Sequence, residues 1–419
     1  MPHTWYKVDN VAKVFLASVT RRDPRVFRIS CTLTEEINPD ALAAALQRTA
    51  RDLPHFSVTL HRGLFWHYLE QTDKVPTPVP ETQRPCAAIY GRDLKNALLY
   101  RVSYYRRRIN LEVFHALSDG SGGVVFLQTL VYNYLQLRHP DELAGTPRQP
   151  GASADDMGQD SYHKFYARRA AAPLRDPAAR KPVCRLPGRR LPLDQTQFFE
   201  GHLSVKEMLA RARAMDVSLT SYLAAAQILA VWREVPLLDR GKAVTVGVPV
   251  NLRNYFPSGS GRNFFSTIRI AHAFSGKETL AELAREFDRK LRAELGEERT
   301  KARMDAFERF ERWPVVRLIP LPIKNAVVAT GNWIEMRRTT LTISNLGRIQ
   351  LPAALSPYVE GFAAYCSSDG LFTTVCSYGD DLVLGTVSAL RSTNILRNFY
   401  RALAEDGLTV TLYASEVNP

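Results

Sequence analysis

The chain has 419 residues, of which 45% are hydrophobic, 10% aromatic and 23% charged. A single hydrophobic core rarely grows beyond roughly 250–300 residues, so this length predicts two domains. The composition is that of a folded protein and excludes collagen-like, coiled-coil and wholly disordered chains.

The formal net charge is +13, and the arginines lie in small groups spread along the chain rather than in one basic run. Two interpretations stay open. The charge is either a solvated, arginine-rich surface, or it attracts an anionic partner such as nucleic acid, an acidic carrier protein or coenzyme A. The sequence carries no nucleic-acid motif and no interleaving of aromatic and basic residues, so nucleic acid is not the expected partner.

Cysteine content and hydrophobic patterning indicate the compartment. The N-terminal stretch carries Lys7, Asp9 and Lys13 where a signal peptide needs an apolar run, and no stretch of about 18 apolar residues occurs. We therefore expect no transmembrane helix and a cytoplasmic protein. Five widely spaced cysteines form no C-x-x-C pair, which favours a reducing compartment over a disulfide scaffold or a structural zinc site; they are Cys31, Cys86, Cys184, Cys366 and Cys376.

The first part of the chain alternates helical and strand patterns. Asn38-Pro39-Asp40 has the composition of a capped helix start, and that helix should end before Pro54. Helical spacing resumes after Gly120. Between the two helices, strands are predicted at 55–60, 64–70, 97–107 and 109–115.

Residues 140–195 contain eight prolines in a polar, charged stretch, and a loop of that length within one compact domain would be unusual. We interpret it as a crossover between an N-terminal lobe, residues 1–139, and a C-terminal lobe, residues 196–419. In the second lobe, helices are predicted near 204–214, 218–234, 277–331 and 392–405, and strands at 197–204, 243–250, 263–274, 339–345, 360–366, 371–377 and 381–387. Each lobe thus mixes sheet and helix, which predicts two layered α/β or α+β domains.

His115 lies where a predicted buried strand ends, and Asp119-Gly120 follows in a turn. With an unperturbed pKa near 6.5, an imidazole at a domain boundary can serve as a general base at neutral pH. Asp119 need not touch the ring. It can instead bind an arginine and backbone amides and so fix the turn, while Gly120 gives the chain freedom to reverse.

Other interpretations of this junction remain. In the first alternative, His115 is a core histidine with satisfied hydrogen bonds, and Asp119 is only the N-cap of the next helix. A metal site is disfavoured because no third ligand is apparent. A dinucleotide fingerprint is not met because Val125 stands where the third glycine belongs, and the chain has no G-x-S-x-G elbow and no P-loop.

The segment HALSDG, 115–120, resembles the H-x-x-x-D-G signature of the coenzyme A-dependent acyltransferase superfamily, which includes chloramphenicol acetyltransferase and nonribosomal condensation domains. Further segments are similar to its bacterial alcohol acetyltransferase-like branch, in matching order: FWHYLE at 65–70, LEVFHALSDGSGG at 111–123, VPVNLRNYFPSGSGRNFF at 248–265 and TISNLGRIQLP at 342–352. The D-F-G-W-G element of plant members is absent. Phe114 replaces the first histidine of the H-H-x-x-x-D-G form typical of condensation domains.

The resemblance implies two chloramphenicol acetyltransferase-like domains, each a mixed sheet with helices on one side, and an active-site tunnel between them. It implies transfer of a short acyl group, acetyl above all, from acyl-CoA to an alcohol, with no acyl-enzyme and no tightly bound cofactor. The catalytic segment would be His115 as the base with Asp119 and Gly120, and Arg253 would be the partner of Asp119. Ser344 and Asn345 would stabilise the oxyanion, and Arg253, Ser260 and Arg262 would bind coenzyme A.

Three other functions remain open on the same fold. In the first, the acyl donor is a carrier protein instead of coenzyme A, which the missing first histidine disfavours. In the second, the acceptor is an amine instead of an alcohol. A non-catalytic binding module is the third alternative, and the intact His115, Asp119 and Gly120 argue against it. The sequence does not reveal the acceptor or the oligomeric state.

Overall fold

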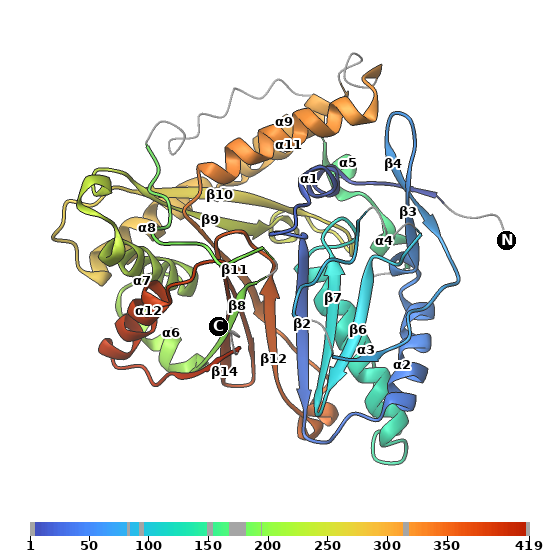
Figure 1. Ribbon diagram of the computed structural model, residues 1–419. Helices are drawn as coiled ribbons and strands as arrows, with labels where there is room; N and C mark the ends of the chain where they lie inside the picture. The colour runs from blue at the N-terminus through green and yellow to red at the C-terminus, as the bar shows by residue number, and fades with distance from the viewer. Residues whose placement is uncertain are drawn as a thin grey trace.

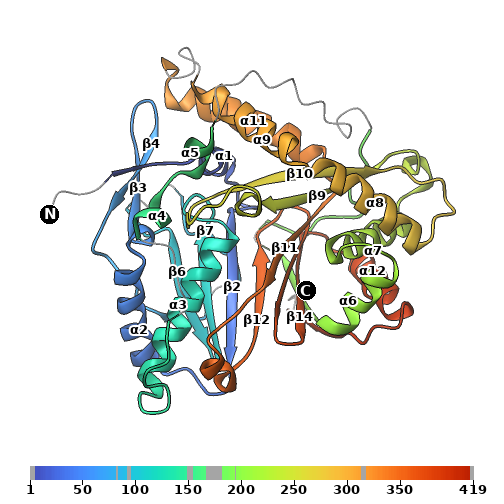
Figure 2. The same ribbon diagram turned by 180° about the vertical axis from the view of Figure 1, so that it is seen from behind.

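The computed structural model describes residues 5–81, 84–91, 96–148, 154–166, 182–193, 195–312 and 318–415, with only the backbone for 154–155 and 306–312. Its strands form three sheets, ordered β1-β4-β3, β12-β2-β7-β6-β5 and β10-β9-β11-β13-β14-β8-β15. Figures 1 and 2 show the five-stranded and seven-stranded sheets side by side, with helices on the outer side of each. The predicted fold class, two mixed α/β layers, is confirmed.

The N-terminal part builds most of the five-stranded sheet and the small three-stranded sheet. Helices α2 and α3 pack against one another, and α3 covers β2 and β7. Its elements are β1 (Trp5–Lys7), α1 (Asn10–Ser18), β2 (Val26–Leu33), α2 (Pro39–Asp52), η1 (Pro54–Phe56), β3 (Val58–Arg62), β4 (His67–Gln71), β5 (Val79–Pro80), β6 (Tyr100–Tyr105), β7 (Arg108–Phe114), α3 (Gly120–Arg138), α4 (Ala154–Gly158) and α5 (Ser161–Phe165).

The C-terminal part builds the seven-stranded sheet, covered by α6, α7, α8 and α12 (Figure 1). Its elements are β8 (Gln197–Ser204), α6 (Val205–Ala214), α7 (Leu219–Glu234), η3 (Leu237–Asp239), β9 (Val244–Asn251), η4 (Leu252–Asn254), β10 (Phe265–His272), α8 (Leu280–Glu294), α9 (Glu297–Arg312), α11 (Leu321–Arg337), β11 (Leu341–Arg348), η5 (Ala353–Tyr358), β12 (Val359–Cys366), β13 (Leu371–Tyr378), β14 (Asp381–Ser388), α12 (Asn394–Glu405) and β15 (Thr411–Ala414).

Local chemistry explains where the helices begin. Asn38 caps α2, its Oδ1 accepting the N–H of Ala41 at 2.9 Å, and Pro39 occupies the first helical position, as the sequence predicts. Thr279 and Glu282 form a capping box at α8. Most strand and helix predictions of the second half are confirmed within a few residues. The region predicted as helical near 277–331 holds three helices, α8, α9 and α11, and α11 runs on to Arg337. Helix α1 and strands β2 and β15 were not predicted.

Strand β12 joins the two halves. Although it lies late in the sequence, it pairs antiparallel with β2 from Val359↔Leu33 to Cys366↔Phe27. Its backbone also approaches β14 so closely that a Cβ on Gly385 would lie 1.9 Å from the carbonyl oxygen of Ala364. The lobe boundaries drawn at 139/140 and 195/196 stay a prediction, since this strand takes part in both regions.

The described part of the crossover is not a plain loop. Helices α4 and α5 pack on the loop between η4 and β10, where the N–H of Gly261 donates to the carbonyl of Met157 at 2.9 Å. The hydroxyl of Tyr162 donates to the carbonyl of Phe265. The crossover therefore supports a loop that, as shown below, reaches the His115 junction.

The sequence also led to expectations about disulfides and about transmembrane helices. All five cysteines are free thiols. Among helices of the described residues, none alone is long and apolar enough to cross a membrane; α6 and α7 pass that test only as a pair, bent by 83°.

Candidate active site

His115 follows the last residue of β7, and both halves of the molecule hold its backbone. Its N–H donates to the carbonyl of Arg25 at 2.8 Å. Its carbonyl accepts from Nδ2 of Asn263 at 2.8 Å, across 148 residues of sequence. The position of the imidazole is thus fixed by a residue before β2 and by a residue on the loop before β10.

Aromatic rings surround the imidazole. Phe15 stacks on it with a centroid distance of 4.5 Å, Phe27 lies at 4.7 Å and Phe265 at 6.2 Å. Within the described part of the chain, Nδ1 has no hydrogen-bond partner. Burial lowers the pKa of His115 to about 4, with Arg25 acting in the same direction and Asp119 opposing it. The ring is therefore neutral at physiological pH.

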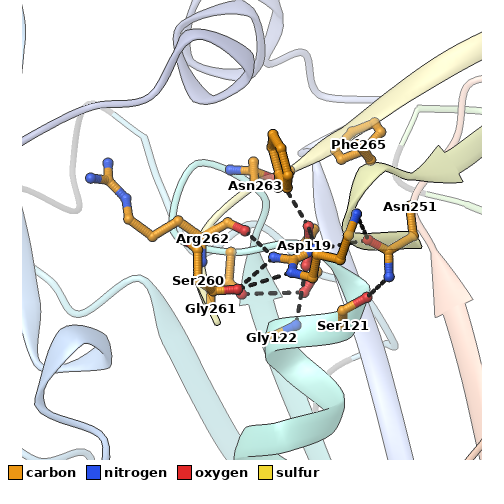
Figure 3. Close-up of polar contacts among 12 residues, drawn as sticks. Asp119, Ser121, Gly122, Asn251, Ser260, Gly261, Arg262, Asn263 and Phe265 are labelled. Carbon is orange, nitrogen blue, oxygen red and sulfur yellow. Dashed lines mark hydrogen bonds and ion pairs between the residues drawn. The ribbon is translucent and has the colours of Figure 1, made fainter. Parts of the chain in front are cut away.

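Asp119 is the N-cap of α3 and joins the two halves of the molecule (Figure 3). Its Oδ1 accepts the N–H of Gly122 at 3.1 Å. Its Oδ2 accepts from Nη1 of Arg253 at 2.7 Å and from the N–H of Phe264 at 2.9 Å. The carboxylate is only 4% exposed and fully engaged, so it fixes the turn that presents His115.

Arg253 lies at this junction as the sequence analysis placed it, but its contacts argue against the second role given to it. Besides Asp119, its N–H groups donate to Oδ1 of Asn251 and to the carbonyls of Ser260 and Arg262. All five guanidinium N–H groups then have protein acceptors, which leaves none for a coenzyme A phosphate.

The other two residues assigned to coenzyme A binding are also committed elsewhere. Ser260 is 4% exposed; its hydroxyl donates to the carbonyl of Gln159 and accepts the N–H of Arg262. Arg262 is 5% exposed and donates to the carbonyl of Lys7. Figure 3 shows its side chain pointing away from Asp119. These contacts argue against phosphate binding by Ser260 and Arg262, and their predicted role stays a prediction.

The expectation that Gly120 gives the turn its conformational freedom is wrong. Gly120 is the first residue of α3 and is absent from the residues with positive φ, so the turn does not depend on its conformational freedom. Gly122 has the stricter requirement. A Cβ there would lie 2.1 Å from the carbonyl oxygen of Gly261 and 2.2 Å from the hydroxyl of Ser118. Gly122 lets the start of α3 touch backbone from the other half of the molecule.

We expect Gly122→Ala to lower the free energy of unfolding by about 1–3 kcal/mol, because backbone atoms on both sides must move apart. Urea unfolding at equilibrium measures the change. Gly241→Ala is the matched control, since a Cβ at Gly241 meets nothing within 4 Å. Equal stability of the two variants would contradict the close contact.

The two residues assigned to the oxyanion lie on β11. Ser344 and Asn345 line the same cavity as His115. Asn345 is exposed, and its amide donates to the hydroxyl of Thr220 at 3.1 Å while its oxygen accepts the N–H of Gly347 at 2.8 Å. The structure thus brings both residues to the cavity but commits part of the amide to its own turn.

The cavity lies between the two large sheets and has a volume of about 560 Å³. Its walls come from α1, β2, His115 and the start of α3 on one side and from β9, β10 and β11 on the other. The sequence analysis missed several of its residues, because no local pattern marks them: Phe15, Arg25, Phe27, Asn251, Phe265 and Thr374. Among the described residues, no group of three or more His, Cys, Asp or Glu side chains is arranged to hold a metal ion.

Residues 203–371 match a family described as "Phthiocerol/phthiodiolone dimycocerosyl transferase C-terminus". No curated protein matches the sequence.

Three solved structures share the fold over nearly the whole chain. Polyketide synthase associated protein 5 from Mycobacterium tuberculosis is 16% identical with a TM-score of 0.61, covering 96% of this chain and 98% of its own. The trichothecene 15-O-acetyltransferase TRI3 from Fusarium sporotrichioides is 12% identical with a TM-score of 0.63, covering 96% and 93%. The starter condensation domain of rhizomide synthetase RzmA is 13% identical with a TM-score of 0.61, covering 96% and 93%.

At these identities the solved structures establish the fold, and the family match over the C-terminal part agrees with it. The resemblance stated from HALSDG and its companion segments agrees with this fold and with the family match. Over nearly its whole length the chain shares the fold of solved acetyltransferases and condensation domains, and its C-terminal part is similar to the dimycocerosyl transferase family.

Proposed function

We propose that the protein transfers a short acyl group from a coenzyme A thioester to the hydroxyl group of an alcohol, with His115 as the general base. One observation carries the proposal: a neutral imidazole, held by backbone hydrogen bonds from both halves of the molecule, lines a cavity between the two sheets. Solved relatives complexed with coenzyme A and T-2, or with C8-CoA, support a thioester donor.

The proposed reaction is a direct transfer. The imidazole accepts the hydroxyl proton as the hydroxyl oxygen attacks the thioester carbonyl. The tetrahedral intermediate then collapses, the C–S bond breaks, and the coenzyme A thiolate takes the proton from the imidazolium. Asp119 takes no part in the proton transfer, because its oxygens are committed to Gly122, Arg253 and Phe264.

The negative oxygen of the intermediate needs a hydrogen-bond donor, and a well-placed donor contributes about 3–4 kcal/mol. We assign this role first to the hydroxyl of Ser344 and second to Asn345, since both line the cavity. The coenzyme A phosphates have no assigned residue in this proposal, because Arg253 and Arg262 donate to protein groups.

The environment of Phe114 disfavours a carrier-protein condensation reaction. Phe114 is fully buried, and its ring stacks on Tyr90 at 5.1 Å. The position that holds the first histidine of the condensation motif is therefore part of the hydrophobic core here.

The proposal is tested by following thiol release from acetyl-CoA and longer acyl-CoAs with a panel of alcohols and amines. We expect release that depends on both substrates and is faster with alcohols. A clear preference for acyl carrier protein thioesters would support the condensation alternative. The absence of turnover with either donor would contradict an enzymatic function and favour a non-catalytic binding module.

The pH dependence of kcat/KM should lack a fall near pH 6.5. A base must be neutral to act, and burial lowers the pKa of His115 to about 4, so the midpoint of the acid limb should lie well below pH 6.5 and toward pH 4. A pH–rate profile measures this limb. A midpoint at or above 6.5 would contradict the assignment of a buried His115 as the base.

The acid limb must be separated from unfolding. Burial also lowers the pKa of His55 and of His67 to about 4. The unfolded chain then binds more protons than the folded one between pH 6.5 and 4, so stability falls as the pH drops through that range. Circular dichroism at each pH shows whether activity is lost before structure.

A further inference from the structure

Helix α11 is an unusually exposed apolar helix. Leu321 is its only buried residue. Ile323, Val327 and Ile334 are 55%, 57% and 42% exposed, and their spacing of four and seven residues places them on one face. Apolar side chains on a helix of a globular protein ordinarily face the core, whereas these three side chains face solvent.

The opposite face of α11 belongs to the cavity. Asn332, Glu335 and Met336 line it, together with residues of α1, which packs against α11. Glu335 forms ion pairs with Arg269 of β10 and with Arg338, which fix this end of the helix. One helix therefore separates the cavity of His115 from an exposed apolar surface.

The tip of the β3–β4 hairpin continues this surface. The N–H of Leu321 donates to the carbonyl of Leu64 at 2.9 Å, and Nζ of Lys324 donates to the carbonyl of Phe65 at 3.1 Å. Figures 1 and 2 show α11 along one edge of the molecule, over α1 and toward the hairpin. We call the whole surface the outer patch: Leu64 (70% exposed), Trp66 (60%), Leu318 (75%), Ile323, Val327 and Ile334.

Basic side chains flank the outer patch. Arg62 is exposed beside the hairpin tip, Lys7 is exposed on the strand that pairs with β4, and Arg337 is exposed at the end of α11. Two acidic side chains near the outer patch have partners: Glu70 lies 3.0 Å from Nε2 of His61, and Glu335 pairs with Arg269 and Arg338. Apolar side chains with a tryptophan and a basic border match the interface of an anionic bilayer.

We propose that the outer patch docks on the surface of an anionic lipid bilayer and that the cavity takes an amphiphilic substrate from it. The apolar side chains would enter the acyl region, Trp66 the headgroup boundary, and the basic residues would bind lipid phosphates. A carrier protein fits less well, because its acidic surface would meet apolar side chains over most of the patch. The route of the substrate rests on the proposed function, whereas docking itself does not.

Sedimentation with lipid vesicles tests the docking. The probes are vesicles of phosphatidylcholine alone and of phosphatidylcholine with phosphatidylglycerol. We expect the full chain to bind the anionic vesicles, and Ile323→Glu with Val327→Glu to weaken that binding by about tenfold or more. Leu237→Glu with Leu238→Glu is the matched control, since both leucines are highly exposed on η3 outside the outer patch, and its binding should stay native.

Each result decides one point. Failure of the native chain to bind anionic vesicles, or equal binding by both double variants, overturns the proposal. Conversion of a dimer to a monomer by the α11 double variant, without vesicle binding, would assign the outer patch to a second copy of the chain instead. Thiol release with short soluble substrates should be unchanged in the α11 double variant. A loss of thiol release would therefore be assigned to the reaction site and not to the docking.

Discussion

Replacing His115 with alanine should lower kcat/KM by about 10²–10⁴-fold, the range expected when a general base is removed. No other described imidazole lines the cavity, so nothing nearby replaces it. The fold should survive, because the ring faces an existing cavity and its Nδ1 is buried without a partner. Thiol release gives the kinetic effect, and thermal unfolding shows that the variant is folded.

His61→Ala is the matched control for this substitution. His61 is half-buried on β3 and pairs with Glu70, away from the cavity, so its loss should leave kcat/KM unchanged. Turnover that persists in the His115 variant would show that another group removes the proton. Equal losses in both variants would indicate a general effect of removing a histidine.

Breaking the pair of Asp119 and Arg253 should be the most damaging change to the fold near the cavity. Either alanine substitution leaves a buried charge without its partner, which costs about 3–5 kcal/mol. The double variant should be no less stable than the worse single variant, because it removes both charges together. Urea unfolding of the four proteins gives the coupling free energy.

Additive losses in that cycle would show that the two side chains act independently. Arg253→Lys separates charge from geometry. Lysine keeps the positive charge but cannot donate at once to Asp119 and to the carbonyls of Ser260 and Arg262. Its stability should therefore lie between those of the native protein and Arg253→Ala, and a native stability would show that charge alone matters.

The sequence predicted features that depend on neighbours along the chain. The cap at Asn38, the end of β7 at His115 and the start of α3 after Asp119 follow from local hydrogen bonding and side-chain alternation. The arginine at 253 came from the resemblance, and the structure places it 2.7 Å from Asp119. Its contacts argue against the predicted role in phosphate binding, and the sequence does not show that four acceptor atoms already take its five N–H groups.

Residues that are remote in the chain escaped prediction. Asn263 holds the backbone of His115 through its amide, and Gly122 admits the carbonyl of Gly261, yet neither residue carries a local signature of these contacts. The exposure of the apolar side chains of α11 could not be predicted for the same reason. A period of 3.6 residues shows that a helix has an apolar face but not whether that face is covered.

By itself the sequence determined the two mixed layers, most element positions and the histidine at a strand end, because each depends on side-chain periodicity, capping and turn chemistry within a few residues. Only the tertiary structure decided that β12 pairs with β2, that the crossover supports the loop behind Asp119, and that α11 presents apolar side chains outward. These depend on how distant segments pack, which local periodicity does not encode.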